Sequence, residues 1–167
     1  MTKFQDMLYQ RPDFSRLFEE MKALLKEMEK AGNAEVLFEA MEALDKKSRA
    51  LATQRTLAHI RYTINTKDPF YDTENTVMDE ELPRFKEIST EAARIVLESP
   101  YRNDVAREFG EHLLEKYEVE RKTFKPEIVE DLVEENKLST EYQKLMASAE
   151  IEFEGEKRNL SGLIPFA

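Results

Sequence analysis

Residues 14–64 read FSRLFEEMKALLKEMEKAGNAEVLFEAMEALDKKSRALATQRTLAHIRYTI, two long helical patterns joined by a short glycine-asparagine link. Asp13 can cap the first helix, which we expect to end near Lys30, and Gly32-Asn33 terminates it. Because the link is so short, we expect the two helices to form an antiparallel hairpin. The apolar residues of the first helix recur at steps of three and four and predict one buried face, namely Phe14, Leu17, Phe18, Met21, Leu24, Leu25 and Met28.

The second helix is predicted to run from about Ala34 to about Ile64. At 1.5 Å per residue it would be about 45 Å long, slightly longer than the diameter of about 40 Å expected for a compact chain of this size. We therefore expect an elongated helical slab. The apolar stripe becomes polar toward the end of this helix, since Ser48 and Arg55 stand where leucine is expected; its members are Leu37, Met41, Leu44, Ser48, Leu51, Arg55, Ala58 and Tyr62.

The middle of the chain predicts further helices with less certain boundaries. Residues 65–75 contain several turn-forming residues, which favours a connecting segment before a third helix over residues 76–97. Pro83 costs about 3 kcal/mol inside a helix, so we expect either a kink there or a helix that begins near Glu80. A fourth helical region follows over residues 103–123 and is expected to break or bend at Gly110.

The last third of the chain predicts two more helices and the only strand signal. Pro126 suits the first turn of a fifth helix, and residues 136–138 are interpreted as a break before a sixth helix that Ser139 caps. From Ile151 the run IEFEGEKRNL alternates apolar and charged residues around Glu154-Gly155, which predicts a β-hairpin. The predicted fold is therefore mainly α, an elongated antiparallel bundle of about five to six helices with one short C-terminal hairpin.

These patterns divide the chain into two expected parts. Residues 1–149 form a helical N-terminal domain, and residues 150–167 form the hairpin and the start of a following element. Because the final residues, LIPFA, are apolar where free tails are usually polar, we expect that following element to be truncated.

Composition narrows the classes of partner. The net charge is −10, from 35 acidic and 25 basic residues, and basic residues cluster only briefly. A surface that binds nucleic acid needs clustered Lys and Arg to displace counterions, so we expect no nucleic-acid partner. There is no cysteine for a disulfide or a thiolate metal site. Neither a signal-peptide core nor a run of about 18 apolar residues is present, so we expect a soluble, cytoplasmic protein with no membrane partner.

The sequence lacks a recognisable catalytic constellation. Its two histidines, His59 and His112, have no partner at the four-residue spacing of an HExxH zinc motif, and that motif is absent. No serine lies in a Gly-x-Ser-x-Gly elbow. We therefore predict no catalytic residue, no metal ligand and no cofactor within this chain.

A polar and aromatic run, LAHIRYTINTKDPFY at residues 57–71, is the most distinctive stretch. Cations near a helix C-terminus are stabilised by the helix dipole, so a structural capping and ion-pairing role is one interpretation. The other is that the run docks another domain or lines a substrate channel. The candidate residues for that second role are Arg55, His59, Arg61, Tyr62, Phe70 and Tyr71.

Three stretches resemble the N-terminal region of oligoendopeptidase F-type enzymes, members of the zinc oligopeptidase family that includes thimet oligopeptidase. They are QRPDF at residues 10–14, LAHIRYTINTKDPFYDTEN at residues 57–75, and TFKPEIVEDLVEENKLSTEYQKLMASAEIEFEGEKRNLSGLIPF at residues 123–166. They occur in the family's order and extend over essentially the whole chain.

The resemblance implies a mostly helical enzyme with a deep channel that admits only short peptides. Its zinc site, HExxH plus a glutamate from a following helix, belongs to a C-terminal catalytic domain, and no residue of this chain matches it. The chain would then be a non-catalytic N-terminal part that forms one wall of the channel and restricts substrates to short peptides. Its partners would be its own catalytic domain and, through the parent enzyme, short peptides. The alternative is a freestanding helical protein-interaction adaptor whose apolar stripe is covered by a partner helix.

Overall fold

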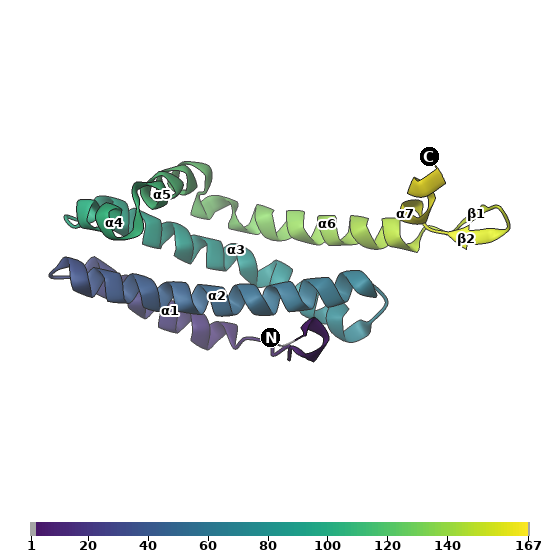
Figure 1. Ribbon diagram of the computed structural model, residues 1–167, viewed down its shortest axis with the longest axis horizontal. Coiled ribbons are helices and arrows are strands. Elements are labelled where there is room, and N and C mark those ends of the chain that lie inside the picture. The colour runs from purple at the N-terminus through teal and green to yellow at the C-terminus, as the bar shows by residue number, and fades with distance from the viewer. Residues whose placement is uncertain (1–2, 167) are drawn as a thin grey trace.

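The helical hairpin predicted from residues 14–64 is present in the computed structural model, which describes residues 3–166. Helices α1 (Phe14–Glu29) and α2 (Ala34–Ile64) pack along each other (Figure 1). Each begins at a side-chain cap, because the Asp13 carboxylate accepts from the Arg16 amide at 3.1 Å and the Asn33 side chain accepts from the Val36 amide at 2.9 Å. The predicted Asp13 cap and the short link are confirmed, and the structure adds a cap at Asn33.

Helix α3 (Pro69–Glu98) begins earlier than predicted, so the expected long connection over residues 65–75 is wrong. Asp68 caps the helix by accepting from the amides of Phe70 and Tyr71 at 2.9 and 3.3 Å. Pro69 occupies the first turn, where its missing N–H would be unpaired in any helix. The Asp-Pro pair is therefore a helix start and not a helix break.

Helix α3 also continues through Pro83, so a start near Glu80 is wrong. Pro83 has no N–H to donate to the carbonyl of Asp79 four residues earlier. The side chain of Asn136 on α6 donates to that carbonyl at 3.2 Å and supplies the missing hydrogen bond. The neighbouring helix thus compensates for the proline.

The next two helices follow the prediction, and the one after them does not. Helices α4 (Arg102–Phe109) and α5 (Glu111–Thr123) are separated at Gly110, whose φ of 90° is easily reached only by glycine. After a 3₁₀ turn, η2 (Pro126–Ile128), helix α6 (Val129–Ser148) runs without interruption across the predicted break at residues 136–138. Asn136 directs its side chain to α3 and not to its own backbone, which removes the reason for a break.

The predicted β-hairpin is confirmed. Strands β1 (Ile151–Phe153) and β2 (Glu156–Arg158) are antiparallel, and the turn residues Glu154 and Gly155 have φ of 53° and 80°. Two consecutive positive φ values are typical of the tight turns that fit twisted hairpins. Helix α7 (Leu160–Leu163) and a 3₁₀ turn, η3 (Ile164–Phe166), follow. Phe166 packs on Phe153 with ring centroids 5.3 Å apart.

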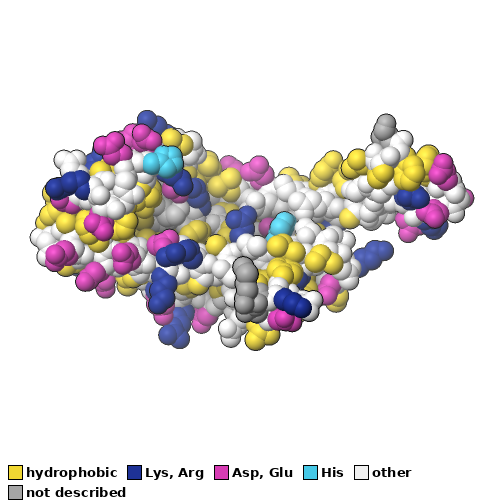
Figure 2. Space-filling model, in the orientation of Figure 1, with side chains coloured by type: hydrophobic (Ala, Val, Ile, Leu, Met, Phe, Trp, Pro, Cys, Tyr) yellow, Lys and Arg dark blue, Asp and Glu magenta, His cyan; other side chains and the backbone are white. Residues whose placement is uncertain are grey.

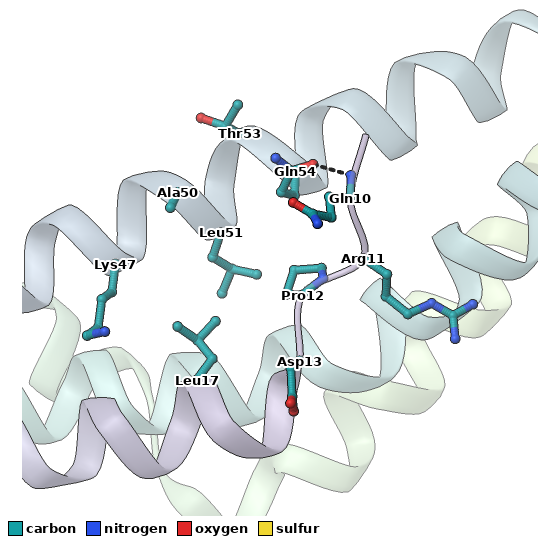
Figure 3. A pocket seen from close by; sticks show the side chains of 10 residues that line it. All are labelled: Gln10, Arg11, Pro12, Asp13, Leu17, Lys47, Ala50, Leu51, Thr53 and Gln54. Carbon is teal, nitrogen blue, oxygen red and sulfur yellow. Dashed lines mark hydrogen bonds between the residues drawn. The ribbon is translucent and has the colours of Figure 1, made fainter. Parts of the chain in front are cut away.

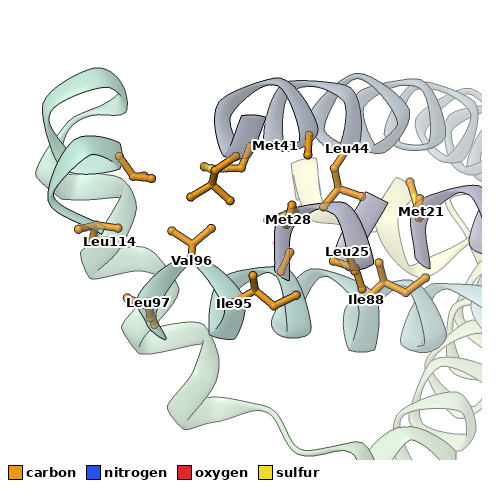
Figure 4. Packing of buried hydrophobic residues seen from close by; sticks show 14 residues of the cluster. Met21, Leu25, Met28, Met41, Leu44, Ile88, Ile95, Val96, Leu97 and Leu114 are labelled. Atoms are coloured by element: carbon orange, nitrogen blue, oxygen red, sulfur yellow. The ribbon is translucent and has the colours of Figure 1, made fainter. Parts of the chain in front are cut away.

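The core lies between α1, α2 and α3, and α4 and α5 add to it at one end (Figure 4). Fourteen buried residues form the main cluster, among them Met21, Leu37 and Val96, which are fully buried. A smaller cluster contains Phe14, Leu51, Ala58 and Met78. The molecule is an elongated, mainly α bundle with one hairpin, as predicted, and residues 3–166 contain seven α-helices.

Candidate functional site

The residues before α1 lie across the far end of α2 and α3, and Arg61 holds them there. We call residues 3–13 the N-terminal strap; it contains one short 3₁₀ turn, η1 (Phe4–Asp6). Arg61 donates to the hydroxyl of Tyr71 at 2.7 Å and to the carbonyl of Met7 in the strap. Its guanidinium also lies over the rings of Phe4 and Tyr71, at 5.8 and 5.5 Å from their centroids.

Aromatic rings join the strap to the start of α3. Tyr9 in the strap makes edge contacts with Phe70 and Tyr71, at centroid distances of 6.1 and 6.0 Å, and Phe70 and Tyr71 lie 5.0 Å apart. Such edge-to-face arrangements are favourable beyond the area that they bury. Phe70 nevertheless keeps 54% of its surface exposed.

A buried carboxylate completes this attachment. Glu74 on α3 is 2% exposed, and it accepts from both Arg11 Nε (2.9 Å) and Tyr9 Oη (2.5 Å). Nη2 of Arg11 also donates to Oε1 of Glu74, so the contact between the two side chains is bidentate. The Arg11 hydrogen bonds hold the pKa of Glu74 below its usual range, although burial acts in the opposite direction. Burial raises the pKa of Tyr9, and the bond to Glu74 adds to that effect.

Sequence reasoning missed Tyr9, Arg11 and Glu74 as a unit. Glu74 is one of 35 acidic residues, and its partners lie more than sixty positions away in the chain. The one signal was Arg11 within the QRPDF stretch that carries the family resemblance.

A second polar group links α2, α3 and α6. Nδ1 of His59 lies 3.3 Å from Oδ1 of Asn75, and the Asn75 amide donates to Asp79 at 3.1 Å and to Thr140 at 3.3 Å. Thr140 in turn donates to Asp79 at 2.6 Å. The pKa of Asp79 is raised, chiefly by burial. We call Asn75, Asp79, Asn136 and Thr140 the interhelix polar network; the sequence did not reveal it.

The six candidates from the sequence do not converge on one point. Arg61, Phe70 and Tyr71 contact the strap, and His59 contacts the interhelix polar network. Tyr62 is fully buried, its hydroxyl has no hydrogen-bond partner among the described residues, and burial raises its pKa. The side chain of Arg55 is exposed on α2.

A groove of about 550 Å³ lies between the strap and the first two helices (Figure 3). Leu17 and Leu51 extend into it from α1 and α2, and Pro12 borders it from the strap. The side chain of Gln54 closes one side by accepting from the Gln10 amide at 2.9 Å. Its lining is mixed, with an apolar floor and amide and charged groups at the edges.

Comparison with known proteins identifies the chain. Residues 4–124 match the family model of the peptidase M3 N-terminal domain. This chain belongs to that family. It is similar in structure to a protein assigned as an oligoendopeptidase F, with 40% identity and a TM-score of 0.94 over 99% of the chain. A PZ peptidase A solved with an inhibitor is also 40% identical, with a TM-score of 0.94 over 98% of the chain.

A third structure, from Bacillus anthracis str. Ames, is also assigned as an oligoendopeptidase F; it is 34% identical over 99% of the chain, with a TM-score of 0.93. The chain spans 29–30% of the length of these three structures. It therefore corresponds to an N-terminal fragment of an oligoendopeptidase F-type peptidase. None of the curated protein sequences matches the chain.

Zinc, which the family resemblance implies, does not fit the side chains of this peptidase M3 N-terminal domain. Residues 3–166 contain no group of three or more His, Asp or Glu side chains arranged to hold a metal ion. His112 lies on α5, 3.3 Å from Glu115, whereas His59 lies on α2 beside Asn75. No helix in the same range is long and apolar enough to cross a membrane.

Proposed function

We propose that this chain is the non-catalytic N-terminal part of a cytoplasmic zinc oligopeptidase, where it forms one wall of the peptide channel and restricts substrates to short peptides. The observation that carries the proposal is the match of nearly the whole chain to less than a third of complete peptidases. The sequence itself contains no HExxH motif, so the zinc-activated water of the parent enzyme would come from elsewhere in that protein.

The internal bonding of the domain suits a wall that excludes large substrates. Exclusion by size requires a surface that does not open when a long chain presses on it. The strap is held to α2 and α3 through Arg61 and through the buried Glu74. The interhelix polar network holds α6 to α3. These attachments join residues distant in sequence, so they oppose bending of the slab.

Three of the six candidates have exposed side chains that can contact a peptide or another domain: Arg55, His59 and Phe70. Arg61 and Tyr71 are occupied in holding the strap, and Tyr62 is in the core. We therefore assign channel-wall or docking roles first to Arg55, His59 and Phe70.

A chimera tests the proposal. This chain would replace the matching N-terminal region of the 40%-identical oligoendopeptidase F, and cleavage of a short fluorogenic peptide would be compared with cleavage of a denatured protein. We expect the short peptide to be cut and the denatured protein to remain intact. Arg55→Glu combined with His59→Ala should raise KM for the short peptide several-fold, whereas His112→Ala, at an exposed histidine on α5, should not. A folded chimera that digests the denatured protein equally well would contradict the proposal.

The alternative, a freestanding helical adaptor, predicts a different result. An adaptor would bind a separate partner protein with high affinity, and the chimera would gain no peptidase activity from it. A correctly folded but inactive chimera would favour that alternative.

A further inference from the structure

Over residues 136–145, helix α6 has its polar side toward the bundle. Three residues spaced four apart, and therefore on one face of the helix, bond to α3: Asn136, Thr140 and Lys144. Lys137 beside them also pairs with α3, at 2.8 Å from Glu80. Lys144 pairs with Asp72 at 2.6 Å. Among the described residues of α6, Thr140 alone is buried. Helix α6 is thus attached by hydrogen bonds and two ion pairs and not by a buried apolar stripe.

The opposite face of the same helix is apolar and uncovered. Leu138, Tyr142 and Leu145 are spaced by four and three residues, which places them together on one side. They are 58, 61 and 68% exposed. Helix α7, which contacts α6, is followed by Ile164, also largely exposed. Figure 2 shows hydrophobic side chains along the arm, the part of the molecule formed by the end of α6, the β-hairpin and α7 that projects beyond the bundle in Figure 1. A helix packed against a bundle normally directs these side chains inward.

The border of this face is acidic. A shallow hollow on α6 is lined by Leu138 and Ser139 together with the carboxylates of Asp131, Glu134 and Glu135. A complementary surface would therefore offer apolar side chains bordered by Lys or Arg. A second copy of this chain would not offer such a surface, because a two-fold interface brings the same surface patch of each copy together. Acidic borders would then meet in a chain whose net charge is −10.

We propose that the outer face of α6, formed by Leu138, Tyr142 and Leu145, is the surface on which the remainder of the peptidase docks through an apolar segment bordered by basic residues. This inference rests on the proposed function. The three solved neighbours each contain more than two thirds of their chain outside the part that this chain matches, which provides an occupant of sufficient size.

The absence of cysteine makes a direct test possible. Leu145→Cys would be introduced into the isolated 167-residue chain and into the chimera described above, and its rate of reaction with a thiol reagent would be followed by peptide mass spectrometry. We expect rapid labelling in the isolated chain and labelling at least tenfold slower in the chimera. Val119→Cys, at a position 60% exposed on α5, is the matched control and should react rapidly in both.

A second measurement uses the triple substitution of Leu138, Tyr142 and Leu145 by Ser. It should leave Tm of the isolated chain unchanged and lower Tm of the chimera, because only in the chimera is that face covered. The inference is overturned if Leu145→Cys is no more protected in the chimera than Val119→Cys. It is also overturned if the isolated chain is a dimer in sedimentation and the triple substitution dissociates it. Activity of the chimera on the short peptide reports separately on the proposed function, so the two can fail independently.

Discussion

Helices α1 and α6 differ in where their apolar side chains lie. Helix α1 buries Phe14, Met21, Leu25 and Met28 against its neighbours. Helix α6 is longer but buries only Thr140 among its described residues, and it leaves Leu145 exposed. The first helix obtains its stability from apolar burial within this chain, whereas the second is held by polar bonds that specify position more than they stabilise.

This difference shows that the bundle covers its apolar side chains within this chain, whereas the arm leaves apolar side chains uncovered. The bundle of α1, α2 and α3 buries apolar residues of all three helices in two clusters. The outer face of α6 would gain stability from a further surface. Four predictions follow from this contrast, beginning with the largest expected effect.

A leucine from each region provides the first test. Leu37→Ala, in the fully buried core of the bundle, should lower the free energy of unfolding by about 2–5 kcal/mol because it removes buried contacts and leaves a cavity. Leu145→Ala, on the outer face of α6, should change it by less than about 0.5 kcal/mol in the isolated chain. Urea denaturation measures both. Equal effects would show that α6 buries that face within this chain.

The strap's attachment provides the second test. Arg11→Ala leaves the Glu74 carboxylate buried without its main partner and should cost about 1–3 kcal/mol. Because Arg11 holds the pKa of Glu74 below its ordinary value, the stabilisation is present above about pH 4.3, the unfolded value, and is lost as pH falls through the folded pKa. Urea denaturation from pH 7 to pH 3 should therefore show a smaller loss of stability in Arg11→Ala than in the wild type. Parallel curves would contradict this role of Glu74.

The compensation at Pro83 provides the third test. Asn136→Ala removes the donor to the Asp79 carbonyl and should cost about 1 kcal/mol. In a Pro83→Ala background residue 83 regains an N–H for the same carbonyl, so Asn136→Ala should cost less there. A double-mutant cycle measures the coupling. Simple additivity would show that Asn136 acts through another contact.

The hairpin turn provides the fourth test, with the smallest expected effect on global stability. Gly155 has φ of 80°, and no atom lies within 4 Å of the position that a Cβ would occupy. Gly155→Val should therefore cost about 1–2 kcal/mol through backbone strain alone. Because the hairpin belongs to the arm, we expect faster hydrogen exchange at residues 151–158 with little change in the global Tm. Gly32→Val, at a glycine that also has open space around it, is the control for side-chain size.

Several structural features could be predicted because they depend on neighbouring residues. The hairpin of α1 and α2 follows from Asp13, Asn33 and the apolar periodicity between them, and the β-turn follows from Glu154-Gly155. The errors occurred at Pro69, Pro83 and Asn136, where the local signal for a break is strong. Pro69 lies in the first turn of α3, where its missing N–H would be unpaired in any helix. The hydrogen bond missing at Pro83 is supplied by Asn136 of α6, whose side chain is directed across the interface to α3 and not to its own backbone. Those partners cannot be inferred from local patterns.

The candidate site divides in the same way. In the run at residues 57–71 the helix end at Ile64 was correctly placed, whereas residues 69–71, expected in a connection, belong to α3. The resemblance of the run to oligoendopeptidase F agrees with the family match. Its role in docking or in lining a channel remains a prediction. Tertiary structure decided that Arg61 holds the strap, that Glu74 is the buried anchor and that His59 lies beside Asn75.

By itself the sequence determined the helical class, the family and the Asp13 cap, because periodicity and capping are properties of residues a few positions apart. Only the tertiary structure decided which polar residues are buried and which apolar residues are exposed. Burial depends on contacts across more than sixty positions, as between Arg11 and Glu74 or between Asp79 and Thr140. Only the packing of α6 against α3 showed that Leu138, Tyr142 and Leu145 face outward.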